Sequence, residues 1–242
     1  MNALWNDLRY ALRMLRKSPV FTAIAVLSLA VGIGANSAIF SLVDQILIRL
    51  LPVKEPQQLV LLTMKGMHYG SNWGGNALSY PMYADFRDNN QVFSGMFCRF
   101  PNYLSLSFRG QTERVAAELV SGSYFPVLGV GAALGRTFTP EEDKVPNGHP
   151  LVMLSYSYWK SRFASDRTLI GKTVVVNGHN MTVIGVAQPG FDGVELGFVT
   201  QVFVPVMMKA QMTPLWDGMK DRRWRWVNAF GRLKPGITAQ KA

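Results

Sequence analysis

The residues whose types could support phosphate chemistry include a Gly-Lys-Thr triplet at Gly171–Thr173. In a phosphate-binding loop this triplet closes a turn whose first glycine would stand at position 166, where this chain has Asp166. No strand–loop–helix pattern surrounds the triplet, so we interpret it as the start of a strand. Gly129 and Gly131 open like a dinucleotide-binding fingerprint, but Leu134 stands where the third glycine is needed. The sequence therefore predicts no nucleotide or cofactor site.

Metal and nucleophilic chemistry are not indicated either. His68, His149 and His179 stand far apart and form none of the spacings typical of metal ligands. The sequence contains no G-x-S-x-G turn that could hold a serine nucleophile. The carboxylates of Glu141–Asp143 follow a proline and are typical of a solvated edge. We expect no catalytic residue, no metal and no cofactor, and we predict that the chain is not an enzyme.

The net charge of +10 raises nucleic acid as a partner. Most of the basic residues are scattered, however, which is typical of a solvated surface. Basic and aromatic residues alternate over Arg222–Trp226 and could stack on bases. In a domain outside the cytoplasm, such a stretch is expected to pack on the surface or to contact a partner. We therefore expect no nucleic acid as a partner. The single cysteine, Cys98, excludes an intrachain disulfide.

An apolar segment of 24 residues, Val20–Val43, contains no ionisable side chain. A bilayer core about 30 Å thick needs about 20 apolar helical residues, so the segment is long enough to span it with some tilt. A cleaved signal peptide is the alternative, but its apolar region is only about 7–15 residues long. We predict a transmembrane helix that stays in the chain.

Basic residues are concentrated before this span. Arg9, Arg13, Arg16 and Lys17 precede it, whereas Arg49 and Lys54 follow it beside Asp44 and Glu55. The positive-inside rule places the more basic flank in the cytoplasm. The chain after about Leu50 is then expected to lie outside.

The segment before the span has the pattern of an amphipathic helix. Apolar residues recur at helical spacing, namely Trp5, Leu8, Leu12 and Leu15, with arginines between them. Such a helix lies along the headgroups and brings its basic side chains to anionic lipid. We predict a membrane-surface contact made by Trp5, Arg9, Arg13, Arg16 and Lys17. A simple N-terminal cap of the span is the alternative.

Small and polar residues in the second half of the span indicate packing against other helices. Ser28, Gly32 and Asn36 follow one four-residue spacing, and Ala30, Gly34 and Ala38 follow another. Small residues at this spacing let helix backbones approach closely, and an asparagine is costly when it faces lipid. The predicted helix-packing residues are Gly32, Gly34 and Asn36. A single anchor without partners is the alternative, because such spacings arise easily in helices rich in alanine and glycine.

After the span, strand and helix patterns are mixed. The expected strands are residues 59–64, 103–108, 112–120, 151–154, 173–176, 181–186, 202–206 and 226–233. The expected helices are residues 80–89, capped by Ser79, and residues 121–128 and 156–163. Asn177–Asn180 carries a hairpin signal. Because strands and helices do not alternate as regular βαβ units, the predicted class is α+β, with one N-terminal transmembrane helix.

Seven motifs, taken in order, resemble MacB/FtsX-type ABC transporter permeases of the acidobacterial-type branch. They are DLRYALRMLRKSPVFTAIAVLSLAVGIGANSAIFSLVDQILIRLLPV at Asp7–Val53, SYPMYADFR at Ser79–Arg87, VSGSYFPVLGV at Val120–Val130, LGRTFTPEED at Leu134–Asp143, LSYSYWKSRF at Leu154–Phe163, IGKTVVVNGHNMTVIGVAQPGF at Ile170–Phe191 and GRLKPG at Gly231–Gly236. Each motif alone is weak, but the ordered set covers nearly the whole chain.

The resemblance implies a cytoplasmic amphipathic segment at 1–18, a transmembrane helix at 19–50 and a MacB-like periplasmic core domain at 51–242. The chain would lie in the bacterial inner membrane. Its expected partners are membrane lipid, a separate ABC ATPase subunit, and further permease helices or a second permease copy.

The function implied is that of a permease segment that couples cytoplasmic ATPase action to the periplasmic domain for export or extraction of substrate. The alternative is a membrane-anchored binding or sensory module without transport activity. Permeases of this family return to the membrane after the domain, so we expect this chain, which ends at Ala242, to be a fragment, a truncated product or a degenerate copy.

Overall fold

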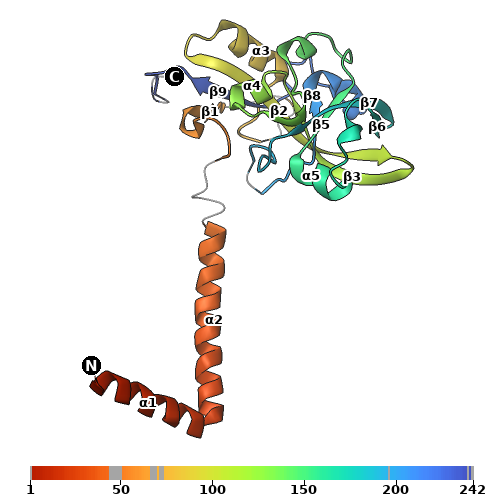
Figure 1. Cartoon of the computed structure of the whole chain (residues 1–242). Coiled ribbons are helices and arrows are strands. Elements are labelled where there is room, and N and C mark those ends of the chain that lie inside the picture. The colour runs from red at the N-terminus through yellow and green to blue at the C-terminus, as the bar shows by residue number, and fades with distance from the viewer. Residues whose placement is uncertain are drawn as a thin grey trace. The chain divides into compact units, whose positions relative to one another are not determined.

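The computed structural model describes residues 2–43, 51–65, 70, 74–195, 197–238 and 240. The chain divides into two units, Met1–Leu50 and Leu51–Ala242. The first is called here the helical unit and the second the β-rich domain (Figure 1).

The helical unit contains α1 (Asn2–Lys17) and α2 (Pro19–Val43). Ser18 separates them, and Pro19 starts α2 at a position where its missing N–H leaves no hydrogen bond unmade. The Thr22 hydroxyl donates to the Leu15 carbonyl at 2.7 Å, which satisfies one of the free carbonyls at the end of α1. Among the described residues, one helix is long and apolar enough to cross a membrane, over Pro19–Phe40 with mean hydropathy 2.0.

The described strands of the β-rich domain form one nine-stranded sheet. They are β1 (Leu59–Leu61), β2 (Phe93–Phe108), β3 (Gln111–Val120), β4 (Ala132–Gly135), β5 (Leu151–Leu154), β6 (Thr173–Val176), β7 (His179–Ala187), β8 (Val202–Pro205) and β9 (Asn228–Leu233). Their order is β1-β9-β2-β3-β8-β5-β7-β4, and β6 pairs with both β2 and β7. The β3–β8 and β5–β7 pairs are parallel and the others antiparallel. The sheet is therefore mixed.

Short helices connect and cover these strands. They are α3 (Tyr80–Asn89), α4 (Tyr124–Leu128), α5 (Tyr156–Arg162) and α6 (Lys209–Met212), with 3₁₀ turns η2 (Pro56–Gln58), η3 (Pro140–Asp143), η4 (Arg167–Leu169) and η5 (Val206–Met208). Ser79 caps α3 by accepting a hydrogen bond from the Met82 N–H, as its sequence position predicts. The α+β class predicted from the sequence is confirmed.

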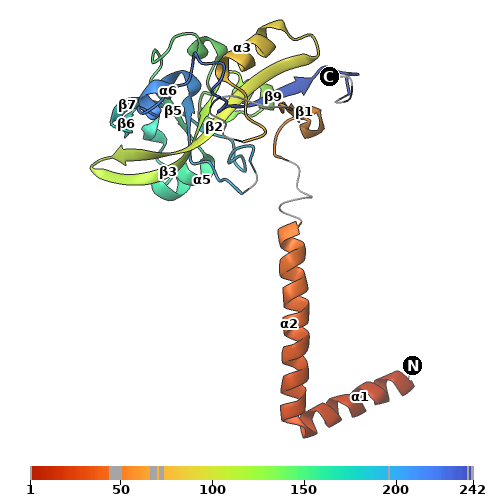
Figure 2. The same cartoon turned by 180° about the vertical axis from the view of Figure 1, so that it is seen from behind.

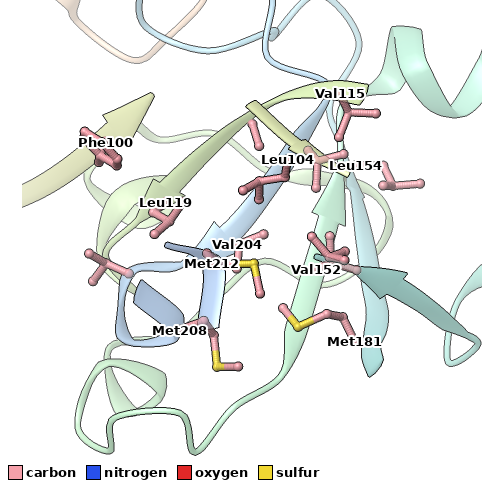
Figure 3. Close-up of a cluster of buried hydrophobic side chains, with 14 of the residues drawn as sticks. Phe100, Leu104, Val115, Leu119, Val152, Leu154, Met181, Val204, Met208 and Met212 are labelled. Atoms are coloured by element: carbon pink, nitrogen blue, oxygen red, sulfur yellow. The ribbon is translucent and has the colours of Figure 1, made fainter. Parts of the chain in front are cut away.

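Two apolar clusters occupy the two faces of the sheet. Successive side chains of a strand point to opposite faces, so in β2 Met96 and Cys98 join one cluster while Phe97 joins the other. The first cluster is aliphatic and methionine-rich at its centre, where Val152, Met181 and Met208 gather (Figure 3). The second is dominated by aromatic rings, namely Phe97, Tyr124, Phe125, Phe138, Phe191 and Phe203. Burial of both faces gives the domain its hydrophobic stabilisation.

Three element predictions need correction. The strand expected at 59–64 ends at Leu61, and the helix expected from residue 121 begins at Tyr124. The strand expected from residue 103 begins ten residues earlier, at Phe93. Proline is disfavoured inside sheets because it lacks an N–H, and Pro101 therefore hid the first half of β2. In the structure the pairing of β9 with β2 stops at Arg99, so Pro101 pairs only with β3 and its missing N–H is tolerated.

Candidate functional site

The predicted membrane-surface residues all lie on α1. Trp5, Arg9, Arg13, Arg16 and Lys17 are exposed there. Arg16 and Lys17 stand in the last helical turn, where cations interact favourably with the negative end of the helix dipole. The structure therefore provides the helix and the exposed basic side chains, while lipid contact stays a prediction.

The predicted helix-packing residues lie on α2, which is helical throughout Pro19–Val43. A helix advances about 100° per residue, so Gly32 and Asn36 share one face and Gly34 lies on the opposite side. A Cβ atom added to Gly32 or Gly34 would meet nothing within 4 Å, and Asn36 is exposed. Both faces are open among the described residues, and the packing itself stays a prediction.

The segment that follows the span in sequence is fastened to the β-rich domain by backbone hydrogen bonds. The Lys54 N–H donates to the Leu128 carbonyl at the end of α4, at 2.9 Å. The same segment continues into β1, which pairs with β9 in antiparallel register (Figure 1 and Figure 2). In that register Leu59 lies opposite Arg232. The entry of the chain into this domain is thus a paired edge strand.

Arg232 of β9 ties this entry segment to α4. Its guanidinium donates to three backbone carbonyls: Nε to Val127 at 2.8 Å, Nη1 to Glu55 at 3.1 Å and Nη2 to Lys54 at 2.6 Å. Hydrogen bonds from a charged donor are stronger than neutral ones, and Arg232 is only 9% exposed. Burial lowers the pKa of Arg232, and Glu55 opposes that shift.

The fit around Lys54 is close. Gly129, which ends α4, has φ +70°, and a Cβ added there would lie 2.6 Å from the Lys54 Cβ. Glu55 also adopts the left-handed conformation, with φ +43°, which is uncommon for a residue with a side chain. Its carbonyl is one of the three that Arg232 holds. We call this set, Lys54, Glu55, Gly129 and Arg232, the junction.

A buried charge network lies on β2 and β3, which follow β9 in the sheet. Arg99 of β2 donates to Glu118 Oε1 of β3 at 2.9 Å and to Glu195 Oε2 at 2.5 Å. The Tyr124 hydroxyl donates to Glu118 Oε2 at 3.0 Å, and Thr200 donates to Oε1 at 2.9 Å. Glu118 is fully buried, and the three donors Arg99, Tyr124 and Thr200 compensate its charge within the protein.

The network has defined protonation states. Burial alone would lower the pKa of Arg99, but Glu118 and Glu195 raise it above its ordinary value. Burial raises the pKa of Tyr124 well above its ordinary value, and the adjacent Glu118 carboxylate adds to that shift. Tyr124 therefore keeps its proton and donates. Arg99 pairs in register with Val120 of β3 and Asn228 of β9, so the network stiffens the centre of the sheet.

Sequence reasoning missed the junction and the charge network. The one signal available for the junction was Arg232 inside an otherwise apolar strand. The carboxylates expected at a solvated edge also need correction, because Glu142 and Asp143 are buried and only Glu141 is exposed. The physical reason is that the Thr139 N–H donates to Glu142 Oε2, and the Gly122 N–H donates to Asp143 Oδ2. No group of three or more potential metal ligands is present in the part of the chain that the structure describes.

A family model described as MacB-like periplasmic core domain matches residues 22–242. No curated protein matches the chain.

Three solved structures are similar in fold. The periplasmic region of MacB from Actinobacillus actinomycetemcomitans is 17% identical, with a TM-score of 0.55 over 75% of this chain and 77% of that one. The extracellular domain of the noncanonical ABC-type transporter YknZ from Gram-positive bacteria is 13% identical, with a TM-score of 0.53 over 74% and 84%. A domain of a putative permease from Porphyromonas gingivalis is 13% identical, with a TM-score of 0.54 over 78% and 80%. At these identities the likeness is one of fold.

Proposed function

This chain belongs to the family of MacB-like periplasmic core domains, and we propose that it is the permease segment of a MacB/FtsX-type ABC transporter. In this proposal α2 crosses the inner membrane with its N-terminus in the cytoplasm. The β-rich domain lies outside, and α2 transmits motion from a separate cytoplasmic ATPase to it. The chain itself performs no catalysis and serves the export or extraction of a substrate.

The observation that carries the proposal is the junction. A domain that is merely tethered needs only a flexible linker between its anchor and its fold. Here the chain is hydrogen-bonded to α4 through the Lys54 N–H and to β9 through Arg232, eleven residues after α2 ends at Val43. A displacement of Lys54 must therefore move β9 and α4 with it.

The buried charged side chains form hydrogen bonds and ion pairs inside the domain, and this supports a mechanical role over an enzymatic one. Arg99 and Glu118 bind each other and their neighbours across three strands, so they stabilise the sheet. A sheet that is rigid at its centre passes a displacement at β9 to β2 and β3 as a body. Rigid transmission is what a coupling domain requires.

The first test is purification of the full chain from native membranes in mild detergent. We expect an ABC ATPase to copurify and the complex to hydrolyse ATP. Recovery of a sensor kinase in place of an ATPase would instead support the membrane-anchored sensory alternative.

The second test probes coupling in that complex. Arg232→Gln removes the guanidinium group that donates to three backbone carbonyls. Arg109→Gln makes the same substitution at the exposed β2–β3 turn and is the matched control. With a fluorophore on the β-rich domain, we expect an ATP-dependent signal in the parent and in Arg109→Gln. The signal should be reduced several-fold in Arg232→Gln at unchanged membrane insertion. An undiminished signal in Arg232→Gln would contradict transmission through the junction.

A further inference from the structure

A cavity of about 460 Å³ lies in the β-rich domain where α3, η3 and η5 meet. Its lining includes Tyr80, Arg87, Ser123, Asp143, Lys144 and Met207. It is separate from the junction, and its volume falls within the range of small-molecule sites, which is about 300–1,000 Å³. Its lining joins apolar surfaces to a few charged groups, as ligand sites commonly do.

Asp143 lines this cavity, and one of its two carboxylate oxygens has no hydrogen-bond partner in the part of the chain that the structure describes. Its side chain is buried, and Oδ2 accepts the Gly122 N–H at 2.7 Å. Oδ1 is buried and has no hydrogen-bond partner among the described residues. A buried carboxylate oxygen without a donor is costly, so it needs an explanation.

The carboxylate is held in a fixed orientation. Glu142, the preceding residue, accepts the Thr139 N–H at 2.9 Å and pairs with Arg136 at 2.7 Å, which closes the η3 turn. Gly122 packs against the Thr139 carbonyl so closely that a Cβ atom there would collide with it. Asp143 Oδ1 is therefore a preorganised acceptor.

The electrostatic surroundings of Asp143 leave it short of positive charge. Burial raises its pKa to about 7; the Gly122 N–H and Arg87 partly oppose this shift, and Glu142 adds to it. Arg87 donates to Asp88 through Nε at 2.7 Å and through Nη2 at 3.1 Å. The neighbouring groups Tyr80, Tyr83 and Cys98 interact electrostatically with Asp143, and burial raises the pKa of each of them, so all three are neutral.

We infer that this cavity binds a small zwitterion of the amino-acid type, with its ammonium group on the Asp143 carboxylate and its carboxylate toward Lys144 and Arg87. Asp143 is the buried charge of the cavity, whereas Lys144 is exposed at its rim. A lone cation would meet Lys144 unfavourably and a lone anion would meet Asp143 unfavourably. A zwitterion satisfies both, and the Tyr80 ring and Met207 offer apolar surface to its side chain.

The test compares three probes of one size on the detergent-purified full chain by calorimetry: phenylalanine, phenethylamine and 3-phenylpropionate. Phenethylamine lacks the carboxylate and 3-phenylpropionate lacks the ammonium group. We expect phenylalanine to bind most tightly and 3-phenylpropionate least. Binding of 3-phenylpropionate as tight as that of phenylalanine would overturn the inference.

Variants assign the two charges. Asp143→Asn keeps an oxygen for the Gly122 N–H but replaces the free acceptor with a donor, so phenylalanine should lose about 10- to 100-fold in affinity. Lys144→Gln should remove the advantage of phenylalanine over phenethylamine. Glu141→Gln removes an exposed carboxylate from the same turn and should leave phenylalanine binding within about twofold. Equal losses in Asp143→Asn and Glu141→Gln would refute a specific site.

The pH profile provides a separate readout. Because the ammonium group needs an ionised Asp143, phenylalanine should bind more tightly at pH 8 than at pH 5.5 in the parent. The same rise should be absent from Asp143→Asn. A rise of equal size in both proteins would show that another group controls binding and would overturn the assignment.

Discussion

Lys209 is fully buried, and aromatic rings hold its ammonium group. Its Nζ lies 3.2 Å from the centre of the Trp216 ring and 4.8 Å from that of Trp226, and it donates to the Trp216 carbonyl at 3.1 Å. Such cation–π contacts favour the charged form. Burial acts in the other direction and lowers the pKa of Lys209 to about 7, while Asp217 raises it. Aromatic rings and a carbonyl thus surround the buried ammonium group of Lys209, whereas two carboxylates compensate the buried guanidinium group of Arg99.

The carboxylate partner of Arg99 gives the first stability prediction. Glu118→Ala would leave Arg99 without its buried partner and would leave the Tyr124 and Thr200 hydroxyls without an acceptor. We expect a loss of about 3–5 kcal/mol in the free energy of unfolding. The matched control is Asp85→Ala, which breaks the exposed pair with Arg222 and should cost less than about 1 kcal/mol. Urea titration followed by tryptophan fluorescence measures both, and similar losses would contradict the role of the network.

Asp143 gives a pH-dependent prediction that does not depend on any ligand. Its pKa rises from 3.8 to about 7 on folding. The folded protein then binds more protons than the unfolded chain between about pH 4 and pH 7, so the Asp143 contribution to stability falls as pH rises through that window. Asp143→Asn removes this penalty. The free energy of unfolding of Asp143→Asn minus that of the parent should therefore be about 2–4 kcal/mol larger at pH 8 than at pH 4. A parent-to-variant difference that stays constant from pH 4 to pH 8, measured by denaturant titration, would contradict this.

At the scale of elements, a comparison of Gly129 with Gly178 distinguishes the stability cost of a left-handed backbone from the cost of close packing. Gly129 and Gly178 both have positive φ, at +70° and +82°, but only Gly129 faces a neighbour, Lys54. Gly178→Ala should cost roughly 1–2 kcal/mol for the left-handed conformation alone. Gly129→Ala should cost about 1–3 kcal/mol more, because the added methyl group must displace Lys54. Equal losses of stability for the two variants in thermal unfolding would mean that the junction accommodates the added methyl group without cost.

The face of α2 that carries Gly32 and Asn36 gives an element-scale prediction about association. Close helix packing in lipid depends on small residues and interhelical hydrogen bonds. Gly32→Leu and Asn36→Leu should therefore weaken association in a membrane two-hybrid assay and leave insertion intact. Ile33→Leu, which keeps the apolar volume, is the control and should have no effect. If both variants associate as well as the parent sequence, α2 acts only as an anchor.

Local signals made some elements predictable and others not. The hairpin between β6 and β7 was predictable because Asn177 and Gly178 both favour the positive φ that its turn needs, and both have it in the structure. The first half of β2 was not, because Pro101 is tolerated only where β9 stops pairing. Arg232 and Asp143 were not recognised because their partners, Lys54 and Gly122, are distant in sequence. Tertiary contacts decide such roles, and short motifs do not carry them.

At the scale of the whole molecule, the first and last strands of the domain are neighbours. β1 is at one end of the sheet order and pairs with β9, which in turn pairs with β2. A force that enters at β1 therefore acts on β9 directly and reaches the charge network one strand further on. In the proposed coupling, this path would use strand pairing and the side chains of Arg232 and Arg99.

The last prediction concerns the side of the membrane on which each unit lies. The chain has one cysteine, Cys98, which is fully buried in the β-rich domain and whose thiol pKa burial raises well above its ordinary value. It should not react with a maleimide in the folded protein, because the thiolate is the reactive form. Single cysteines can then be placed at two exposed positions, Tyr10 on α1 and Gln111 at the β2–β3 turn. With four cations before the span and a nearly balanced flank behind it, a membrane-impermeant maleimide should label Gln111→Cys in intact spheroplasts. Tyr10→Cys should react only after the membrane is permeabilised. The reverse pattern would place the β-rich domain in the cytoplasm and would remove the basis for coupling across the membrane.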